Sequence, residues 1–592
     1  MLLLAFFGVF AVALGSKLAF WQVVKVDELR QRAAAQTQAT LFEPSERGRI
    51  LDRNGLLLAT TEYRDLLAAY PPRVPDGERR TAMVQTLAAI LNLDGEGTTR
   101  VTTALGSGAE YTVLARDLTE SQSERIRAAV AEGKLPGLAL EPKPVRVYPN
   151  PGGAPGTTLA SQLLGFVNRA GEGHYGIEER YQALLAGQPR ELTALRDRNG
   201  RPLGGTEIVK DPGVKGATIR LSIDASLQLQ VEKELYAAWV ANQSKRVSAV
   251  VMAPDTGELL AWASVPAYDA NDYAAVAKDS PQLLHDPIVS EVYEPGSVMK
   301  MFTAAAALEH DVVTPQTRIS DTAELRISRN VIHNSDRRGK GSIPFRDVIA
   351  FSRNVGTARV AAMLGDDIAS AASVLYDTWA RLGVGRLTNV DVSHEVNGLV
   401  SNPARSRWAA IDLANRSFGQ GVAVTPIQLA SSFSAMVNGG MRVQPHLLVA
   451  VNDEPAEVVE KRQVITSELS TQLTSLMTHV LTGVPYYDEG TRIPGYLVGG
   501  KTGTAQIWDS KEGRWAWNLY NFSFAGFVGR DRPQAVIMTR IHETRPHVAR
   551  VGDFRLGITS YELFRRIAID TIDALDIPPA EPPPSTGTAA RP

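Results

Sequence analysis

Ser297 and Lys300 have residue types and a spacing that suit nucleophilic catalysis. They lie in the sequence Glu-Pro-Gly-Ser-Val-Met-Lys, directly before an apolar run, and this order predicts a turn into a helix. Residues three apart on a helix share a face, so the hydroxyl and the amine can meet. A lysine can take a serine proton if burial and nearby positive potential lower its pKa. Because about one chance S-x-x-K is expected in such a chain, the alternative is a capping serine beside a surface lysine.

A second candidate element is Lys501-Thr-Gly-Thr504, which follows two glycines and leads into a strand-like sequence. Glycines at the start of a strand allow a ligand or another backbone to approach closely. The hydroxyls of Thr502 and Thr504, together with Lys501, are suited to binding a carboxylate. The backbone N–H groups of Thr504 and Ser297 could form an oxyanion hole. The alternative is a lysine in a glycine-rich turn.

A third element, Ser-x-Asn, occurs twice, at Ser328-Arg-Asn330 and at Ser352-Arg-Asn354. The first copy follows a strand-like sequence and lies in a polar loop. The second copy follows an amphipathic segment and precedes a helix-like segment rich in small residues, which predicts a rigid corner between two helices. We therefore predict that Ser352 and Asn354 belong to the site and that Ser328 does not.

The elements around these motifs predict one large α+β domain. Strand-like sequence begins near Thr218, and Asp255-Thr-Gly257 predicts a turn between two strands. Strands at both ends of a helix-rich middle predict an antiparallel sheet covered by helices. The predicted strand regions are 218–223, 247–254, 258–266 and 521–541, and the predicted helices are 225–240 and 558–575.

The region before this domain is predicted to be a mixed scaffold without a catalytic cluster. Asn54-Gly55 lies between two apolar runs and predicts a hairpin, because the tight turn needs positive φ. A second Asp-Arg-Asn-Gly sequence, at Asp197–Gly200, predicts another hairpin. Helices are predicted from composition and periodicity at 27–38, 81–93 and 120–132.

The first 24 residues are almost continuously apolar and can cross a bilayer, which takes about 20 residues in a helix. The charge of Lys17 can reach the interface, and Trp21 suits the interfacial belt. A signal peptide cleaved after Ala11-Val-Ala13 is the alternative, but the apolar run continues past that site and lacks a basic segment before it. A short tail preceding Met1 would explain that lack. The basic residues after the span alone would place the next region in the cytoplasm, although long domains cross largely regardless of such charges.

The composition excludes several classes of function. The chain has 592 residues, of which 44% are hydrophobic and 21% charged, and this is typical of a multidomain globular protein. A formal net charge of -2 provides no field for binding nucleic acid, so we expect no such partner. Because cysteine is absent and no histidines have a metal-binding spacing, we expect no disulfide, no thiol nucleophile, no metal and no cofactor.

The three motifs in this order form the set found in penicillin-binding proteins and class A β-lactamases. The chain resembles the class B penicillin-binding proteins, which are peptidoglycan D,D-transpeptidases, and most closely their FtsI-like division type. The resemblance includes the pedestal motif Arg47–Gly55, Glu294–Ser297 and the glycine-rich Ser417–Gly421, and it extends to about Leu575. It implies a serine β-lactamase-like transpeptidase fold. The implied domains are an anchor (1–24), a pedestal or dimerisation-like scaffold (25–216), a transpeptidase domain (217–576) and a disordered proline-rich tail (577–592).

The resemblance also implies a role for each motif residue. Ser297 attacks the carbonyl between two terminal D-alanines of a stem peptide, and Lys300 takes its proton. Ser352 relays a proton to the leaving nitrogen, with Lys501 tuning it, and Asn354 holds the substrate amide. The implied carboxylate-binding residues are Thr502, Gly503 and Thr504.

The implied partners are peptidoglycan stem peptides, β-lactam antibiotics, a SEDS-type glycosyltransferase and other divisome membrane proteins. The implied location is the cell (inner) membrane, with a single span and the catalytic domain on the extracytoplasmic side. Two other functions are compatible with the same fold. One is a D,D-carboxypeptidase or β-lactamase, in which water resolves the ester, and the other is a non-enzymatic β-lactam sensor.

Two details near the Lys501 motif add further expectations. Gly499 and Gly500 are expected to make the start of the strand more flexible than a single glycine would. The aromatic residues that follow the motif are expected either to form a hydrophobic wall above the site or to pack in the core. These residues are Trp508, Trp515, Trp517 and Tyr520.

Overall fold

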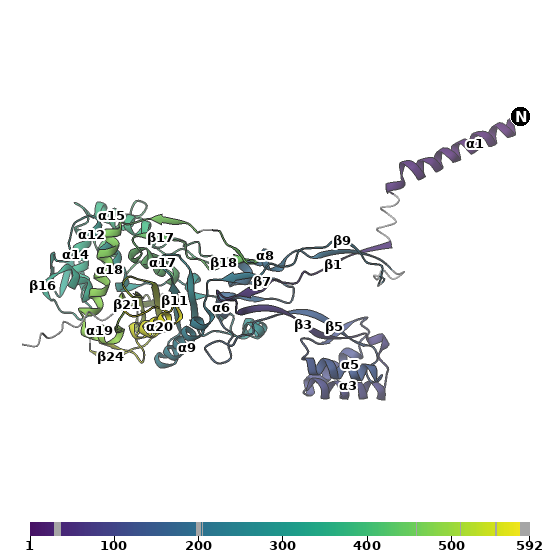
Figure 1. Ribbon diagram of the computed structural model, residues 1–592, viewed down its shortest axis with the longest axis horizontal. Coiled ribbons are helices and arrows are strands. Elements are labelled where there is room, and N and C mark those ends of the chain that lie inside the picture. The colour runs from purple at the N-terminus through teal and green to yellow at the C-terminus, as the bar shows by residue number, and fades with distance from the viewer. Residues whose placement is uncertain are drawn as a thin grey trace, which may run out of the picture. The chain divides into compact units, whose positions relative to one another are not determined.

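The computed structural model describes residues 1–28, 37–196, 203, 205–457, 459–509, 511–550 and 553–580. Its backbone divides into two compact units (Figure 1). The first unit comprises Met1–Gly48 and Ala183–Ala217, and the second comprises Arg49–Gln182 and Thr218–Pro592.

The first unit contains a long apolar helix and a small sheet. The helix α1 (Leu2–Ala19) continues through a π-helical turn (Phe20–Val24), and its apolar stretch of 22 residues is long enough to cross a membrane. The sheet is antiparallel and has the order β1-β8-β9. Its strands are β1 (Gln38–Glu43), β8 (Arg190–Leu195) and β9 (Ile208–Asp211). The hairpin predicted at 197–200 and most of the helix predicted at 27–38 lie outside the described residues.

The scaffold part of the second unit is a mixed sheet with three helices packed on it. The sheet has the order β19-β18-β10-β2-β3-β4, and β5 also pairs with β3. Figure 1 shows α3 and α5 beside the long strands β3 and β5, and buried leucines and isoleucines fill the space between them. The helices are α3 (Glu78–Leu91), α4 (Gly95–Leu105) and α5 (Glu120–Ala131), and the strands are β2 (Ile50–Leu51), β3 (Leu57–Ala69), β4 (Thr112–Ala115), β5 (Leu138–Val147), β10 (Ile219–Leu221), β18 (Leu448–Val451) and β19 (Glu454–Pro455).

The hairpin predicted at Asn54-Gly55 is confirmed, because β2 and β3 pair in antiparallel fashion around a Gly55 with a φ of 89°. Asp52 fixes this turn from inside. Its carboxylate accepts hydrogen bonds from the backbone N–H groups of Asn54 (2.9 Å), Leu56 (2.7 Å) and Ala225 (3.1 Å). The carboxylate therefore ties the pedestal motif to the start of the first helix of the catalytic part.

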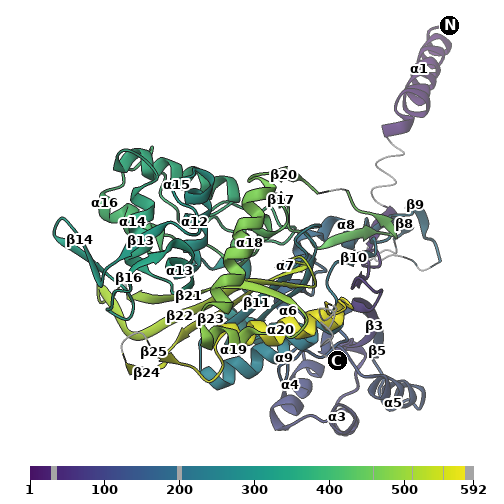
Figure 2. The same cartoon turned by 60° about the vertical axis from the view of Figure 1, so that its left-hand side comes forward.

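The catalytic part contains the predicted antiparallel sheet covered by helices. Its five strands have the order β12-β11-β23-β22-β21, and every neighbouring pair is antiparallel. Helices α9 and α20 pack on one face, and α17 and α18 pack on the other. Figure 2 shows α9, α18 and α20 against the strands of this sheet. The strands are β11 (Arg246–Met252), β12 (Leu259–Val265), β21 (Leu497–Asp509), β22 (Arg514–Gly529) and β23 (Ala535–Thr544), and the helices are α9 (Ala225–Asn242), α17 (Pro426–Val437), α18 (Ser467–Thr482) and α20 (Ser560–Ala574).

A helical layer lies beside this sheet and is centred on α12 (Lys300–Glu309). Every residue from Lys300 to Leu308 is buried, because the run of four alanines lets neighbouring helices approach closely. The surrounding helices are α13 (Phe345–Ala350), α14 (Asn354–Ala362), α15 (Ile368–Leu382) and α16 (Ala410–Ser417).

Short elements connect these layers. The helical ones are Pro71–Arg73, α6 (Ser161–Leu164), α7 (Gly176–Arg180), α8 (Gln182–Ala186), Ala270–Asp272, α10 (Tyr273–Asp279), Pro281–Leu283, α11 (Pro287–Ser290), Gly296–Met299 and α19 (Pro485–Thr491). The strands are β6 (Phe166–Val167), β7 (Gly173–His174), β13 (Arg318–Asp321), β14 (Glu324–Ile327), β15 (Asn330–His333), β16 (Gly341–Pro344), β17 (Met441–Val443), β20 (Lys461–Gln463), β24 (His547–Arg550) and β25 (Asp553–Arg555).

Replacing Asp52 tests whether its carboxylate holds the pedestal motif together. We expect Asp52→Ala to lower the free energy of unfolding by about 2–4 kcal/mol, because three backbone N–H groups lose their acceptor. Asp76→Ala, which removes a carboxylate that is 90% exposed, is expected to change it by less than about 0.5 kcal/mol. Urea denaturation of both variants provides the comparison, and equal effects would show that Asp52 has no special role.

Candidate active site

Ser297 lies where a tight turn meets the central helix. It belongs to a 3-10 turn (Gly296–Met299), and Lys300 is the first residue of α12. The Lys300 Nζ lies 3.0 Å from the Ser297 Oγ, so the structure brings the predicted pair together. Gly296 has a φ of 58°, and a Cβ at this position would lie 2.6 Å from the Thr504 carbonyl oxygen. A glycine is therefore needed for the turn to approach the Lys501 strand.

The strand β21 carries the Lys501 motif directly against this turn. A Cβ on Gly503 would lie 2.3 Å from the Pro295 carbonyl oxygen and 2.9 Å from the Val298 side chain. Only glycine leaves room for this approach, which brings the backbone of Thr504 beside that of Gly296. The strand thus lies where the predicted oxyanion hole requires it.

The glycine-rich motif Ser417–Gly421 supports the turn from its other side. A Cβ on Gly419 would lie 2.0 Å from the Gly296 carbonyl oxygen. The Thr303 hydroxyl donates to the Ser417 carbonyl oxygen (2.7 Å), and the Gly421 N–H donates to Glu294 (2.9 Å). The turn that contains Ser297 is therefore held between the backbone of this motif and that of the Lys501 strand, and this close approach explains the glycine at position 419.

The structure brings the second Ser-x-Asn copy to Lys300. Ser352 lies at the corner between α13 and α14, whereas Ser328 lies in the turn between β14 and β15. The Lys300 Nζ contacts the Ser352 Oγ (3.1 Å), the Ser352 carbonyl oxygen (2.5 Å) and the Asn354 Oδ1 (2.8 Å). The Ser352 backbone has a φ of 57°, a left-handed conformation that is uncommon for serine. Its hydroxyl and its carbonyl oxygen both reach the same amine.

Lys501 approaches Ser352 from the other side. Its Nζ lies 3.1 Å from the Ser352 Oγ, 3.1 Å from the Thr502 carbonyl oxygen and 3.3 Å from the Thr502 Oγ1. The Ser352 hydroxyl therefore lies between two lysine amines, in the position that a proton relay requires.

Burial sets the protonation of both amines. Lys300 and Lys501 are both fully buried, with 0% of their surface exposed. Burial lowers the pKa of Lys300 well below its usual range, and the positive charges of Lys501 and Arg353 lower it further. Burial alone lowers the pKa of Lys501 to about 7. A neutral Lys300 can donate its two N–H groups to the Ser352 carbonyl and Asn354 amide oxygens, and this leaves its one lone pair for the proton of the Ser297 hydroxyl.

The family models match two stretches of this chain. The penicillin binding protein transpeptidase domain matches residues 247–554, which include every predicted site residue, and the penicillin-binding protein dimerisation domain matches residues 42–221. The chain belongs to the penicillin-binding protein transpeptidases.

Named relatives of this transpeptidase extend along nearly the whole chain. The penicillin-binding protein PbpB of Mycolicibacterium smegmatis is 29% identical, over 95% of this chain and 89% of its own length. The stage V sporulation protein D of Bacillus subtilis is 30% identical over 91% of this chain and 81% of its own. The peptidoglycan D,D-transpeptidase FtsI of Escherichia coli is 28% identical over 95% of this chain and 89% of its own length.

Solved structures share the fold of this transpeptidase. Penicillin binding protein 3 of Mycobacterium tuberculosis, complexed with aztreonam, has a TM-score of 0.67 at 24% identity and covers 92% of this chain and 99% of its own. Penicillin binding protein 2X of Streptococcus thermophilus has a TM-score of 0.70 at 22% identity, and the match covers 91% of this chain and 80% of that one.

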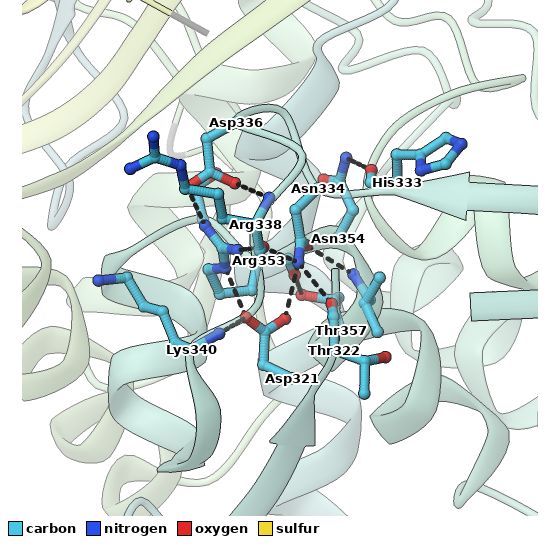
Figure 3. A network of polar contacts seen from close by, with 12 residues as sticks. Asp321, Thr322, His333, Asn334, Asp336, Arg338, Lys340, Arg353, Asn354 and Thr357 are labelled. Atoms are coloured by element: carbon cyan, nitrogen blue, oxygen red, sulfur yellow. Dashed lines mark hydrogen bonds and ion pairs between the residues drawn. The ribbon is translucent and has the colours of Figure 1, made fainter. Parts of the chain in front are cut away.

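A buried polar network behind the Ser352 corner was missed by the sequence reasoning (Figure 3). Arg353, the middle residue of the motif, forms ion pairs with Asp321 (2.8 Å) and Asp336 (3.0 Å) and also donates to the Arg338 carbonyl oxygen. Its side chain is 4% exposed and that of Asp321 is 0% exposed. The segment from β13 to β16 is therefore fastened to the corner that carries Ser352.

Asn334 and the neighbouring backbone complete this attachment. The Asn334 Nδ2 donates to Asp321 (3.1 Å), and its Oδ1 accepts from the Val355 N–H (3.1 Å). The Asn354 Nδ2 donates to the His333 carbonyl oxygen at 3.0 Å (Figure 3). The amide oxygen of Asn354 therefore faces Lys300, whose Nζ lies 2.8 Å away. Arg353 could have been suspected from its place in the motif, whereas Asp321 and Asn334 have no motif that would have indicated them.

The glycines and aromatic residues around the Lys501 strand differ in part from what the sequence predicts. A Cβ on Gly499 would lie 2.4 Å from the Phe527 ring, and one on Gly500 would lie 2.5 Å from the Phe524 ring. Both glycines are buried, so they provide room for two aromatic rings. The prediction of core packing is wrong for Trp508, Trp515 and Trp517, which are 51%, 40% and 83% exposed. Tyr520 is half-buried and packs against Phe522 and Phe554. The aromatic wall stays a prediction.

The depressed pKa of Lys300 predicts the pH dependence of acylation. Acylation by a fluorescent penicillin needs neutral Lys300, so the rate should reach its plateau well below the pH at which a free lysine titrates and fall as acid protonates this amine. Lys501→Met removes a positive neighbour, raises the pKa of Lys300, and should move the acidic limb to higher pH. Lys340→Met, which removes an exposed lysine, should leave the limb in place. A rate that rises only at the pH where a free lysine titrates would contradict this account.

The buried ion pair of Arg353 predicts a large loss of stability on mutation. Arg353→Met leaves the Asp321 carboxylate buried without its partner, and we expect the free energy of unfolding to fall by about 3–5 kcal/mol. Arg346→Met, which alters a half-exposed arginine of the preceding helix α13, should cost less than about 0.5 kcal/mol. Denaturant unfolding measures both, and a similar cost for the two variants would refute the structural role of the Arg353 ion pair.

Proposed function

We propose that this transpeptidase cross-links peptidoglycan stem peptides through a seryl ester on Ser297, in septal cell-wall synthesis. One observation carries the proposal. The amine of Lys300 lies within hydrogen-bond distance of the hydroxyls of both Ser297 and Ser352, and the second of these also contacts Lys501. This arrangement can take a proton from a nucleophile and return it to a leaving group.

Acylation begins when the Ser297 Oγ attacks the carbonyl carbon between the two terminal D-alanines. Lys300 takes the hydroxyl proton, and the N–H groups of Ser297 and Thr504 stabilise the oxyanion of the tetrahedral intermediate. The intermediate collapses when the C–N bond breaks. Ser352 gives its proton to the leaving nitrogen and is replenished by Lys300, so D-alanine leaves as a neutral amine. Asn354 holds the substrate amide during this step.

Deacylation reverses the proton path with a different nucleophile. The amine of a neighbouring stem peptide attacks the seryl ester, loses a proton through Ser352 to Lys300, and forms the new peptide bond. Lys300 then returns a proton to the Ser297 oxygen as the ester bond breaks. A β-lactam would follow the first step only, because its leaving nitrogen stays attached to the acyl group.

The relatives support the substrate and the setting. The Escherichia coli relative is named a peptidoglycan D,D-transpeptidase, and the fold neighbour from Mycobacterium tuberculosis was solved with aztreonam and with ampicillin. We propose a single-pass protein of the cell membrane with its catalytic domain on the extracytoplasmic side. The helix Leu3–Val24 would form the anchor, and a SEDS-type glycosyltransferase with other divisome proteins would be its membrane partners.

We also propose the domain boundaries 1–24 for the anchor, 25–216 for the pedestal, 217–576 for the transpeptidase domain and 577–592 for the tail. The family match at 42–221 ends close to the proposed boundary at 217, and the match at 247–554 lies inside the proposed transpeptidase domain. Residues 581–592 of the proposed tail lie outside the described residues.

Labelling with a fluorescent penicillin tests the nucleophile. We expect mass spectrometry to find the label on Ser297 and on no other residue. Ser352→Ala should slow acylation by at least about tenfold, whereas Ser328→Ala should leave it unchanged, because only the first hydroxyl reaches the lysines. A label elsewhere, or the reverse order of the two variants, would refute the assignment.

An acceptor amine separates transfer from hydrolysis. A D-alanyl-D-alanine thioester analogue forms the acyl-enzyme, and a stem-peptide amine is then added at increasing concentration. We expect the amide product to grow at the expense of the acid. Only acid would favour the carboxypeptidase or β-lactamase outcome, and no acyl-enzyme turnover at all would favour the sensor.

A further inference from the structure

Tyr487 places a buried hydroxyl directly against the Lys501 motif. It lies on α19, and its hydroxyl is 2.8 Å from the Thr502 Oγ1. Thr502 also contacts the Lys501 Nζ at 3.3 Å. Neither the motifs nor the mechanism above assigns a role to this tyrosine.

The hydrogen-bond inventory of Thr502 gives that contact a direction once a substrate carboxylate is bound. A threonine hydroxyl has one proton and two lone pairs, and a carboxylate can only accept. Thr502 must therefore donate its proton to the carboxylate and accept from its other neighbours. The Lys501 amine supplies one of these donors, and the Tyr487 hydroxyl supplies the other.

The surroundings of Tyr487 hold it in that position as a donor. Its ring packs against Tyr486 with centroids 4.3 Å apart and against Tyr561 of α20 with centroids 5.3 Å apart. The Thr491 hydroxyl donates to its carbonyl oxygen at 2.7 Å. Burial raises the pKa of Tyr487 well above its usual range, so its hydroxyl keeps its proton at any physiological pH.

We propose that Tyr487 is a specificity-determining residue, whose hydroxyl orients that of Thr502 toward the terminal carboxylate of the acyl donor. The inference rests on the proposed function, in which Thr502 binds that carboxylate. The donor chain runs from Tyr487 through Thr502 to the ligand. Since a hydrogen bond to a charged group depends strongly on the direction of its donor, the chain favours ligands that bear a free carboxylate.

Benzylpenicillin and its methyl ester test this inference, because they differ only in a methyl group that removes the charge of the carboxylate. The measured quantity is the ratio of their acylation efficiencies on the full-length protein. We expect Tyr487→Phe to reduce this ratio by about tenfold, because Thr502 loses the donor that turns its proton toward the carboxylate and its charge-assisted hydrogen bond is weakened. Phenylalanine preserves the ring packing, and thermal unfolding checks that the variant is folded.

Two matched variants control for the loss of a tyrosine hydroxyl nearby. Tyr561→Phe removes the hydroxyl of the ring that packs on Tyr487, and Tyr496→Phe removes a hydroxyl that donates to the Ile577 carbonyl oxygen (2.9 Å). Both should leave the ratio unchanged. In a Thr502→Val background, Tyr487→Phe should have no further effect on the ratio, because the residue that it acts through is gone.

The outcomes separate this inference from the proposed function. A large ratio in the wild-type protein that Tyr487→Phe does not reduce would overturn the role of Tyr487 and leave the carboxylate site intact. An equal reduction by Tyr496→Phe or Tyr561→Phe would also overturn it. A wild-type ratio near one would mean that Thr502 does not recognise a carboxylate, and this would overturn both.

Discussion

The active site depends on two buried lysine amines that form no ion pair within the described part of the chain. The hydrogen-bond partners that the structure gives Lys300 and Lys501 are oxygens of serine, threonine and asparagine, all of them uncharged. Burial of an unpaired ammonium is costly, so both amines lose protons far more readily than a lysine in water. The same burial that weakens the fold locally makes Lys300 able to take a proton from Ser297.

The surrounding structure holds these catalytic groups in position. Glycines at 296, 419 and 503 let three backbones meet around the nucleophile at distances that no side chain allows. The Ser352 corner has a left-handed backbone, which persists because the neighbouring residues hold it on both sides. Arg353 provides the main attachment, since its buried guanidinium joins the corner to Asp321 and Asp336. Its positive charge also helps to keep Lys300 neutral.

Much of the site could be predicted because chemistry restricts its residue types. Ser297 with Lys300 was predicted from spacing, and the choice of Ser352 over Ser328 followed from its place between two helical segments. The turn at Asn54-Gly55 was predicted because few residues accept its backbone conformation. These features depend on neighbours in the sequence, which is why they can be read from it.

The parts that could not be predicted depend on contacts between distant segments. Asp321 reaches Arg353 only after the strands from β13 to β16 have folded against α14, and no local pattern encodes that approach. The helix α4 was missed because its glycines and threonines are poor helix formers. In the structure its threonine hydroxyls donate to carbonyl oxygens one turn earlier, and Asp94 caps its first turn. Tyr487 lies on a seven-residue helix whose sequence has no recognisable motif.

The most direct test of the account is the ionisation of Lys300 itself. The full-length protein can be labelled with 13C at the lysine side chains, and the Cε signal of Lys300 can be assigned by its absence in Lys300→Met and followed through a pH titration. We expect this signal to titrate well below the range of the exposed lysines, because burial and the positive charges of Lys501 and Arg353 disfavour the ammonium form. A Lys300 that titrates together with the exposed lysines would contradict the account.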